Sequence, residues 1–431
     1  MIASNSSTKI KLYFYSMENI NQLLEDAKLA AIDAKNLTAT QKEKLLQDLA
    51  QALVDNTNLI IQYNQQDLDR MADDNPKKDR LLLNQDRIKA LADSLHDILK
   101  LEDPSGKILY DKTLDNGLHI QKTTVPLGVV GVIYEARPNV TIDVAALCLY
   151  SGNAVVLRGG SDAEKTNEIL VEIIHQCLVK NQLNKNIVQL LPIDRKHVKV
   201  LLEATQFVDI IIPRGSQQLI DFVRDNAKVP TIETGAGVCH TYVEASANLD
   251  NAAKIVVNAK TQRPSVCNAL DTIVVDKTIA KDFLPKLIEG LNEFGVIIYA
   301  DDLSFEILNA AGYKNLQKAT EENFGMEYLS QQCSIKTVNN IDEALAHIRK
   351  YSSKHSEAIV SENLAYCERF LNDVDAAAVY TNASTRFTDG GVFGLGAEIG
   401  ISTQKLHARG PFALEKLTTE KWLVKGSGQV R

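Results

Sequence analysis

The sequence predicts an α/β protein with two α/β domains, each built on a sheet of the parallel type. The first observation is that short apolar runs alternate with helix-length segments of mixed polarity from residue 129 onward. The second is that these runs are continuous, which is typical of strands covered by helices on both faces. The third is the length, because 431 residues at about 100–200 residues per domain predict two or three domains.

The N-terminal part, residues 17–101, predicts helices. Met17 begins the first amphipathic stretch, and the residues before it are expected to form a loose leader. Further along, Thr40 and Glu43 have the spacing of a capping box, in which both side chains bind backbone N–H groups at the helix start. Apolar residues then recur at helical spacing and predict a buried face: Leu45, Leu46, Leu49 and Leu53.

A hairpin is predicted between residues 108 and 124, where Asp115-Asn116-Gly117 separates two short alternating segments. The Asn-Gly pair is favoured in tight hairpin turns because both residues tolerate positive φ angles. At the other end of the chain, residues 421–431 predict an exposed strand.

Two series of strands follow the hairpin. The strands of the first series are predicted at residues 129–134, 154–158, 187–191 and 208–212. The second series begins near residue 241, with further strands predicted at 271–275, 296–299, 334–338, 357–360 and 376–380. The sequence has no low-complexity linker and no repeat of solenoid period.

The charge balance excludes some classes of partner. Lys and Arg number 47 against 55 Asp and Glu, which gives a net charge of -8. A chain of this charge repels a nucleic-acid backbone and an anionic membrane surface. An anionic substrate must therefore be held by a local cluster of Arg and Lys side chains.

The sequence also predicts a cytoplasmic protein. Residues 1–15 lack the cationic start and apolar core of a secretory signal, and no apolar run approaches the roughly 20 residues that cross a membrane. The six cysteines are scattered without CxxC spacing, so we expect reduced thiols and no metal site.

Two strand ends have the residues expected where a nucleotide phosphate meets a helix: Arg158-Gly159-Gly160-Ser161 and Arg214-Gly215-Ser216. Glycine lets a phosphate approach the backbone, the helix dipole favours negative charge, and Arg binds phosphate through two N–H groups. Ser161 also has capping-box spacing with Glu164, so either segment alone is equally consistent with an ordinary strand-to-helix turn. Their recurrence in neighbouring crossovers favours a ligand.

The usual dinucleotide-binding glycine pattern is absent. The segment 394–400 comes near it, but its third glycine is one position too late and no parallel β-α-β unit surrounds it. We interpret this segment as a glycine-rich loop.

Most of the cysteines are expected to be inert. Cys148, Cys177 and Cys367 fall on apolar positions of helical patterns, where a small buried side chain is the ordinary interpretation. Cys239 precedes His240, but neighbouring side chains of an extended strand point to opposite faces, so the two do not form a catalytic pair.

Cys267 is different, because it lies in a non-periodic segment just before a predicted strand. The loop gives access to the thiol, and the nearby Arg263 favours a lower thiol pKa. These features are those of a nucleophile, and on spacing alone a plain structural thiol remains the alternative.

Several segments together resemble the aldehyde dehydrogenase superfamily, and within it the members that reduce acyl phosphates. The segment from Pro126 to Asn139 resembles a strand and loop of that superfamily, in a form that contains Tyr-Glu-Ala-Arg-Pro-Asn. The other matching segments are residues 232–237, 260–268, 382–391 and 393–411, and the last contains Ser-Thr-Gln-Lys-Leu-His-Ala-Arg-Gly. The resemblance extends over residues 17–431.

The resemblance implies an aldehyde-dehydrogenase-like fold in three parts. Residues 17–106 and 126–236 would form the NADP-binding domain and residues 237–411 the catalytic domain. Residues 107–125 and 412–431 would form a small β oligomerisation flap. Because such a flap has exposed strand edges, we expect it to pair with another subunit, which makes the protein a homo-oligomer.

The resemblance also implies the catalytic residues. Cys267 would be the nucleophile, and Asn139 would form an oxyanion hole together with the Cys267 backbone N–H. Glu233 falls at the position where hydrolytic members activate water, but a reductase must keep water away from its thioester. Two roles for Glu233 therefore remain open, a catalytic one and a structural one near the cofactor.

For the cofactor, the resemblance places Arg158 against the adenosine ribose and Gly215-Ser216 at the pyrophosphate, and a looser match places Glu327 near the nicotinamide ribose. NAD-preferring relatives have a carboxylate three positions after the ribose-binding cation, where this chain has Ser161. We therefore expect NADPH to be preferred over NADH.

The substrate's negative charges require cations near these segments. The five candidates are Arg137, Arg263, Arg386, Lys405 and Arg409. Two or three of them are expected to contact the substrate, and the others to form ordinary ion pairs. Arg137 and Arg263 are favoured because each lies within four residues of a candidate catalytic group.

The reaction implied by the resemblance is NADPH-dependent reduction of L-glutamyl 5-phosphate to L-glutamate 5-semialdehyde and phosphate, the second step of proline biosynthesis from glutamate. Two alternatives stay open: a related dehydrogenase that oxidises an aldehyde or forms an acyl-CoA, and a catalytically silent nucleotide-binding protein. The glutamate 5-kinase that supplies the acyl phosphate is a candidate partner, and whether it docks directly is left open.

Overall fold

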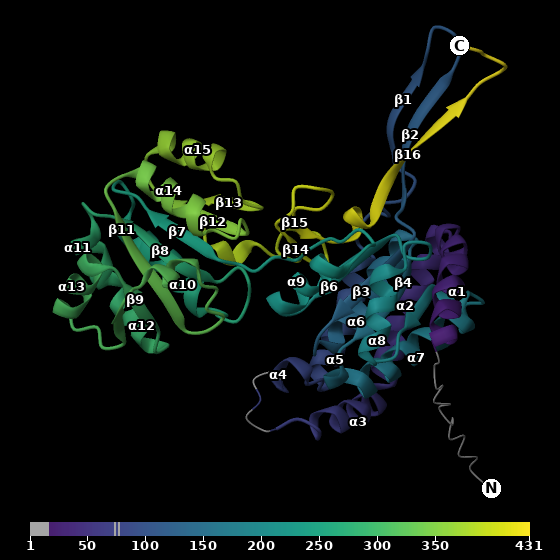
Figure 1. Cartoon of the computed structure of the whole chain (residues 1–431), viewed down its shortest axis with the longest axis horizontal. Helices are drawn as coiled ribbons and strands as arrows, with labels where there is room; N and C mark the ends of the chain where they lie inside the picture. Colours follow the sequence, from purple (N-terminus) through teal and green to yellow (C-terminus); the bar gives the residue numbers. More distant parts are fainter. Residues whose placement is uncertain (1–16, 73–74, 76–77) are drawn as a thin grey trace. The chain divides into compact units, whose positions relative to one another are not determined.

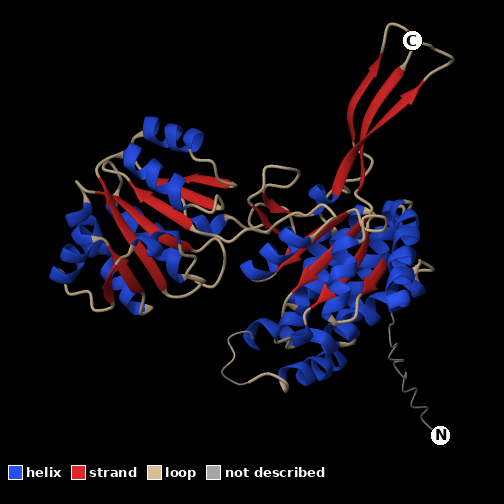
Figure 2. Ribbon diagram, in the orientation of Figure 1, coloured by secondary structure: helices blue, strands red, loops and turns tan. Residues whose placement is uncertain are grey.

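The computed structural model of the chain describes residues 17–72, 75 and 78–431 (Figure 1). The chain forms two compact units. Of the described residues, the first unit comprises those within 17–92, 126–211 and 226–230, and the second comprises Asp93–Val125, Ile212–Asp225 and Thr231–Arg431. Both units contain a parallel sheet flanked by helices (Figure 2), so the predicted α/β fold class is confirmed.

Helices make up the N-terminal part, as predicted: α1 (Met17–Lys35), α2 (Ala39–Asp55), α3 (Thr57–Leu68), α4 (Lys78–Leu81) and α5 (Gln85–Ile98). The four leucines predicted on one face of α2 are buried. The capping box, however, consists of Thr38 and Gln41. Its prediction at Thr40 and Glu43 is wrong by two residues, because α2 begins at Ala39 and Thr40 already lies in the first helical turn.

A four-stranded sheet, most of which lies in the first unit, has the order β5-β4-β3-β6. Its strands are β3 (Val129–Tyr134), β4 (Ala154–Gly159), β5 (Val188–Leu190) and β6 (Ile210–Arg214). The helices that follow these strands along the chain are α6 (Pro138–Ser151), α7 (Glu164–Lys180), α8 (Arg195–Glu203) and α9 (Gln217–Asn226). Strand β4 pairs in parallel with β3 and with β5, as the predicted fold class requires.

The second unit contains a seven-stranded sheet in the order β10-β9-β11-β8-β7-β12-β13, and its neighbouring strands pair in parallel. The strands are β7 (Cys239–Val243), β8 (Leu270–Asp276), β9 (Ile297–Ala300), β10 (Leu316–Lys318), β11 (Gln332–Val338), β12 (Ser356–Val360) and β13 (Ala378–Thr381). The helices are α10 (Leu249–Thr261), α11 (Ala280–Phe283), α12 (Ile288–Glu293), α13 (Asp302–Ala310), α14 (Ile341–Tyr351) and α15 (Leu364–Asp373).

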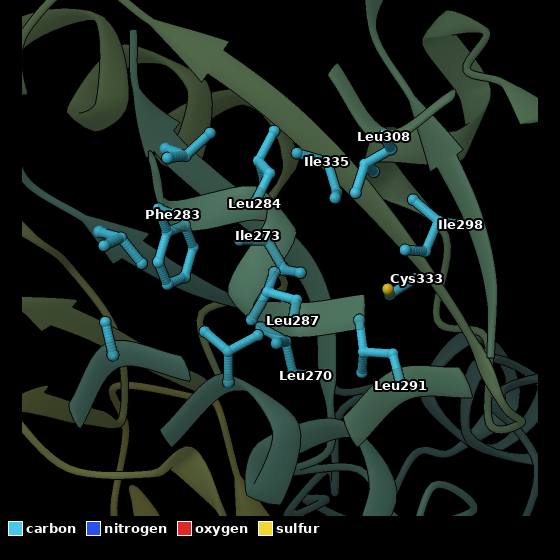
Figure 3. Close-up of a cluster of buried hydrophobic side chains, with 14 of the residues drawn as sticks. Leu270, Ile273, Phe283, Leu284, Leu287, Leu291, Ile298, Leu308, Cys333 and Ile335 are labelled. Atoms are coloured by element: carbon cyan, nitrogen blue, oxygen red, sulfur yellow. The ribbon is translucent and has the colours of Figure 1, made fainter. Parts of the chain in front are cut away.

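Two apolar cores pack against this sheet, one on each face. Ile273 and Val275 of β8 belong to the first core, and Val274 between them belongs to the second, because alternate side chains of a strand point to opposite faces. Figure 3 shows the first core, in which Phe283, Leu284 and other helical side chains pack against the strands. Each such fully buried side chain contributes about 1.5–3 kcal/mol of stability.

A three-stranded sheet in the order β1-β2-β16 is built from β1 (Ile108–Thr113), β2 (His119–Pro126) and β16 (Thr418–Lys425). The predicted hairpin is therefore present, but in its turn only Gly117 has a positive φ and Asn116 does not. The turn is closed by Gly117 N donating to Leu114 O at 2.9 Å, which needs only the glycine in the left-handed region. The predicted C-terminal strand exists, but it lies at residues 418–425.

The remaining elements are short. Strands β14 (Gly400–Ser402) and β15 (Gly410–Phe412) form an antiparallel pair that the sequence did not predict. The glycine-rich segment before β14 is a turn region, as expected. In the part of the chain that the structure describes, no helix combines the length and apolar character needed to cross a membrane.

Candidate active site

Cys267 lies in the loop between α10 and β8, in the second unit. It is partly exposed, whereas the other five cysteines are buried. Among the thiols of this chain, Cys267 is therefore the one that a substrate can reach without the fold opening.

The segment that precedes β7 packs directly against the Cys267 backbone. A Cβ atom at Gly237 would lie 1.5 Å from the carbonyl oxygen of Cys267, so only glycine fits at this position. The Cys239 thiol donates to the same oxygen at 3.2 Å. The Cys267 carbonyl is thus held from one side by residues 237–239.

Cys239 itself is unsuited to nucleophilic chemistry. Burial raises the pKa of the Cys239 thiol well above its ordinary value, and the nearby carboxylates Glu357 and Asp271 raise it further. His240 points the other way, as strand geometry predicts, and its Nδ1 lies 3.0 Å from Glu357 Oε2 in a fully buried pair.

Two guanidinium groups lie near Cys267. Arg386 donates through NH1 to Asn268 Oδ1 and through Nε to Gln262 Oε1 at 3.2 Å. The pKa of Arg386 is lowered, first by burial and then by the positive charge of the nearby Arg263. Arg263 is exposed, and among the described residues no carboxylate forms an ion pair with it. Two cations this close to a partly exposed thiol form a candidate anion site.

Lys405 and Arg409, by contrast, share one carboxylate. Lys405 Nζ lies 2.9 Å from Asp375 Oδ2, and Arg409 NH2 lies 2.6 Å from Asp375 Oδ1. These bonds lower the pKa of Asp375 to about 2. The two cations therefore hold the loop before β13, which favours a fold-supporting role for them.

Glu233 is held by partners on both sides. Its Oε1 accepts from Gln404 Nε2 at 3.1 Å, and its backbone N–H donates to Gln404 Oε1 at 3.0 Å. Its other carboxylate oxygen lies 3.8 Å from the guanidinium of Arg224. The sequence left both a catalytic and a structural role open for Glu233. These contacts of its carboxylate favour the structural role.

Glu327 also binds the backbone of its own unit. Its Oε1 accepts from Gly237 N at 2.8 Å, and burial raises its pKa. The sequence predicts that the Glu327 carboxylate contacts the nicotinamide ribose. One oxygen of this carboxylate is already hydrogen-bonded to Gly237, which packs against Cys267.

At the first glycine-rich strand end, the predicted capping box of Ser161 and Glu164 is wrong. Residues Ser161–Ala163 form a separate 3-10 turn, so Ser161 lies too early to cap α7. The first turn of α7 is bound instead by Asp67 of α3, which accepts from Thr166 N at 2.8 Å and from Lys165 N at 3.1 Å. Nothing in the sequence pattern indicated Asp67, because it lies far from α7 along the chain.

The cation at this strand end fits an anionic ligand. Arg158, in β4, donates through NH2 to Ile193 O at 2.7 Å. Its Nε is buried and has no partner among the described residues. Burial lowers the pKa of Arg158, and the neighbouring Arg195 lowers it further. A partly buried guanidinium with an unbonded Nε is the kind of group that a ribose or phosphate oxygen satisfies.

The second predicted phosphate segment lies between β6 and α9. Ser216 Oγ accepts from Leu219 N at 3.4 Å, so Ser216 lies at the start of α9 as the pattern indicates. Arg214 has a buried Nε with no partner among the described residues, and its positive charge opposes the rise in the pKa of the partly buried Glu398. Gly215 lies between the two.

Asn139 and Arg137 belong to the first unit, at the start of α6. Asn139 is exposed, and its Nδ2 donates to Asp143 at 3.2 Å. Because Cys267 belongs to the second unit, the oxyanion hole that would join it to Asn139 stays a prediction, as does the contact of Arg137 with substrate.

Within the second unit, the Cys267 site contains the groups that acyl transfer requires. It combines an accessible thiol, a glycine that lets the backbone approach, and cations that can hold an anionic leaving group. The sequence did not predict that Glu327 accepts a hydrogen bond from Gly237 N, or that Asp271 accepts one from Cys239 N. These contacts join segments that are far apart in the chain.

Residues 4–307 match the model of the aldehyde dehydrogenase family. The chain therefore belongs to the aldehyde dehydrogenase family.

Its curated relatives specify the group within that family. A gamma-glutamyl phosphate reductase of Chlorobium phaeobacteroides is 51% identical over 415 residues, which are 96% of this chain and 99% of that protein. One of Legionella pneumophila is 50% identical over 414 residues, with the same coverage of both chains. The crystal structure of the gamma-glutamyl phosphate reductase of Thermotoga maritima has a TM-score of 0.91 and 41% identity, and covers 96% of this chain and 99% of that one. The resemblance found in the sequence is thereby confirmed.

More distant structures share the fold alone. An acetylating aldehyde dehydrogenase of Geobacillus thermoglucosidasius has a TM-score of 0.70 at 16% identity, and covers 96% of this chain and 98% of that one. The predicted aldehyde-dehydrogenase-like fold is therefore confirmed as well.

Proposed function

We propose that the protein is an NADPH-dependent reductase that converts L-glutamyl 5-phosphate to L-glutamate 5-semialdehyde and phosphate, a step of proline biosynthesis. The observation that carries this proposal is the match along 96% of the chain to proteins named gamma-glutamyl phosphate reductase. The accessible Cys267 and the two guanidinium groups near it support the same chemistry.

The proposed mechanism begins at Cys267. Its thiolate attacks the acyl carbon, the bond from that carbon to the phosphate oxygen breaks, and phosphate leaves with the electron pair. Bound NADPH supplies the hydride that reduces the thioester. When the carbon–sulfur bond breaks, the thiolate is restored and the aldehyde leaves. Asn139 and the Cys267 backbone N–H are proposed to stabilise the developing oxyanion, and such donors are worth about 3–4 kcal/mol of barrier in comparable sites.

We assign the binding roles as follows. The dinucleotide would be held by residues that include the two incompletely bonded arginines: Arg158, Gly159, Gly160, Ser161, Arg214, Gly215, Ser216 and Glu327. Arg137, Arg263 and Arg386 would hold the substrate's anionic groups. Lys405 and Arg409 act on Asp375 and support the fold. Glu233 is proposed to be structural, through Gln404 and Arg224.

The experiment that tests the function is the reverse reaction. Glutamate 5-semialdehyde, NADP and inorganic phosphate are mixed with the protein, and NADPH formation is followed by its absorbance. We expect turnover that requires phosphate. Turnover without phosphate would favour an aldehyde-oxidising relative, and absence of turnover under all conditions would favour a catalytically silent nucleotide-binding protein.

Replacing Ser161 by Glu is expected to reduce the preference for NADPH over NADH by about tenfold, which corresponds to about 1.4 kcal/mol. Ser161 is exposed at the end of β4, and its carbonyl accepts from the Arg70 guanidinium at 3.2 Å. A carboxylate at this position would repel the 2′-phosphate of NADPH but not the hydroxyl of NADH. The ratio of kcat/KM for the two cofactors measures the effect.

Ser161→Gln is the matched control for this prediction, because it has the size of Glu without the charge. It is expected to keep most of the wild-type preference. Equal kcat/KM values for NADPH and NADH in the wild-type protein would contradict the assignment.

We propose that the sheet β1-β2-β16 is a subunit interface. Its strands expose several apolar side chains: Ile108, Leu109, Tyr110, Trp422, Leu423 and Val424.

Val424→Glu is expected to convert the assembly to smaller species, since it places a charge on a surface that would be buried between subunits. Sedimentation measures the mass, with Leu364→Glu on α15 as the control, because Leu364 is more exposed still. A wild-type monomer, or a variant of unchanged mass, would rule the interface out.

A further inference from the structure

Residues 237–240, which we name the strap, are bound by side chains at every backbone N–H group. Each of these groups donates to a different acceptor: Gly237 to Glu327 Oε1 at 2.8 Å, Val238 to Ser353 Oγ at 2.8 Å, Cys239 to Asp271 Oδ2 at 3.4 Å and His240 to Glu357 Oε2 at 2.9 Å. The pairing of β7 with β8 changes register between Cys239 and His240. Side chains therefore satisfy N–H groups at the point where the strand ladder is interrupted.

The strap is also the part of the fold that contacts Cys267. Gly237 approaches the Cys267 carbonyl closely, and the Cys239 thiol donates to that oxygen. The position of the Cys267 backbone therefore depends on the position of the strap, and the strap depends on its side-chain acceptors.

Asp271 binds a second backbone N–H group in addition to that of the strap. In addition to Cys239 N, it accepts from Tyr328 N at 3.1 Å, and Tyr328 adjoins Glu327, the acceptor for Gly237. Its carboxylate therefore ties the strap to the loop that supplies the neighbouring acceptor. Asp271 is almost fully buried, in the second position of β8.

The buried charge of Asp271 has a counter-ion. Lys260 Nζ lies 3.8 Å from Asp271 Oδ1 and donates to Gln332 O at 2.7 Å, and the Lys260 side chain is fully buried. Burial nevertheless raises the pKa of Asp271 to about 7. A buried ion pair commonly contributes less stability than apolar side chains of the same size, so stability alone is a weak reason for this pair to be present.

We infer that Asp271 is a positioning residue for Cys267: with Lys260 as its counter-ion, it fixes the strap against the Cys267 carbonyl and so directs the thiol at the acyl carbon. This inference rests on the proposed function, in which Cys267 is the nucleophile. Lys260 and Asp271 flank the loop that carries Cys267, one at the end of α10 and the other at the start of β8.

The first test is Asp271→Asn. A carboxylate accepts both backbone N–H groups, whereas an amide accepts one and presents its own NH2 to the other. We expect kcat to fall by about 10- to 100-fold, the loss that a misplacement of about 1 Å produces, with KM for NADPH within about twofold of wild type. An unchanged kcat would overturn the inference.

A double variant separates positioning from simple stability. Asp271→Asn alone leaves Lys260 buried without its counter-ion, which destabilises the fold. In Lys260→Met/Asp271→Asn this unpaired charge is gone, so the unfolding temperature is expected to recover while kcat stays low. If kcat recovers together with the unfolding temperature, Asp271 is only structural and the inference is wrong.

Two controls complete the design. Asp301 is a partly buried carboxylate of the same unit that accepts from Thr337 and Ser304, away from the strap. Asp301→Asn is expected to lower the unfolding temperature while kcat per folded molecule is retained. Cys267→Ala is measured in parallel: if it keeps turnover, both the proposed function and this inference fail. If it is inactive while the double variant has wild-type kcat, only the positioning role fails.

Discussion

Cys267→Ala is expected to abolish turnover while NADPH affinity stays within about twofold of wild type, because the thiol forms the covalent intermediate and does not hold the dinucleotide. Loss of a nucleophile commonly costs at least about a thousandfold in kcat. The reverse reaction measures turnover, and fluorescence titration with NADPH measures affinity. Residual activity above about a thousandth of wild type would contradict the assignment.

Cys367→Ala is the matched control, since it removes a buried thiol of the same unit, on α15. It is expected to retain activity and to lose only a modest amount of stability. Cys239 is a poor substitute nucleophile in the Cys267→Ala variant, because it is buried and its pKa is raised. The structure therefore provides no second thiol that could rescue turnover without the fold opening.

Arg263→Gln is expected to reduce kcat/KM for the phosphorylated substrate by about 10- to 100-fold, since a hydrogen bond to a charged group contributes about 1.5–3 kcal/mol. Arg263 is exposed, four residues before Cys267, and close enough to Arg386 to lower its pKa. An acyl phosphate bound at Cys267 would relieve the repulsion between these two cations. NADPH binding is expected to change little. We expect a comparable loss for Arg137→Gln.

The control for this prediction is Arg369→Gln. Arg369 lies on α15 and forms ion pairs with Asp342 and Asp373, so its charge is already compensated on the surface. It is expected to leave kcat/KM unchanged. If both Arg137→Gln and Arg263→Gln keep wild-type kcat/KM and wild-type phosphate dependence, the anion site has been placed wrongly.

The sequence predicted the parts of the fold that local patterns determine. The continuous apolar run 129–134 identified a buried strand, because burial on both faces leaves no polar positions in it. Strand β10 was missed, since its three residues, Leu316–Lys318, contain a single apolar side chain and lie at the sheet edge. The two capping errors have a related cause, because a helix start is shifted by one or two residues without altering the apolar pattern.

The candidate site was predictable where the chemistry depends on one residue in its local context. Cys267 was distinguished from the other cysteines by its non-periodic segment, and the structure leaves it partly exposed. The strap and its acceptors were not predictable, because the hydrogen bonds join residues 32 to 117 positions apart. A single sequence does not indicate which distant carboxylate accepts a hydrogen bond from which N–H group.

The carboxylate of Asp67 has a consequence for cooperative folding. The Asp67 carboxylate accepts hydrogen bonds from Lys165 N, Thr166 N and the Thr166 hydroxyl in the first turn of α7. Asp67 and Thr166 are 99 positions apart in the sequence. If α3 detaches, these amides lose their acceptor, and the start of α7 frays, next to the residues 158–161 that we propose hold the dinucleotide. The N-terminal helices and the sheet of the first unit should therefore open and close as one unit, so that local unfolding of α3 weakens cofactor binding from a distance.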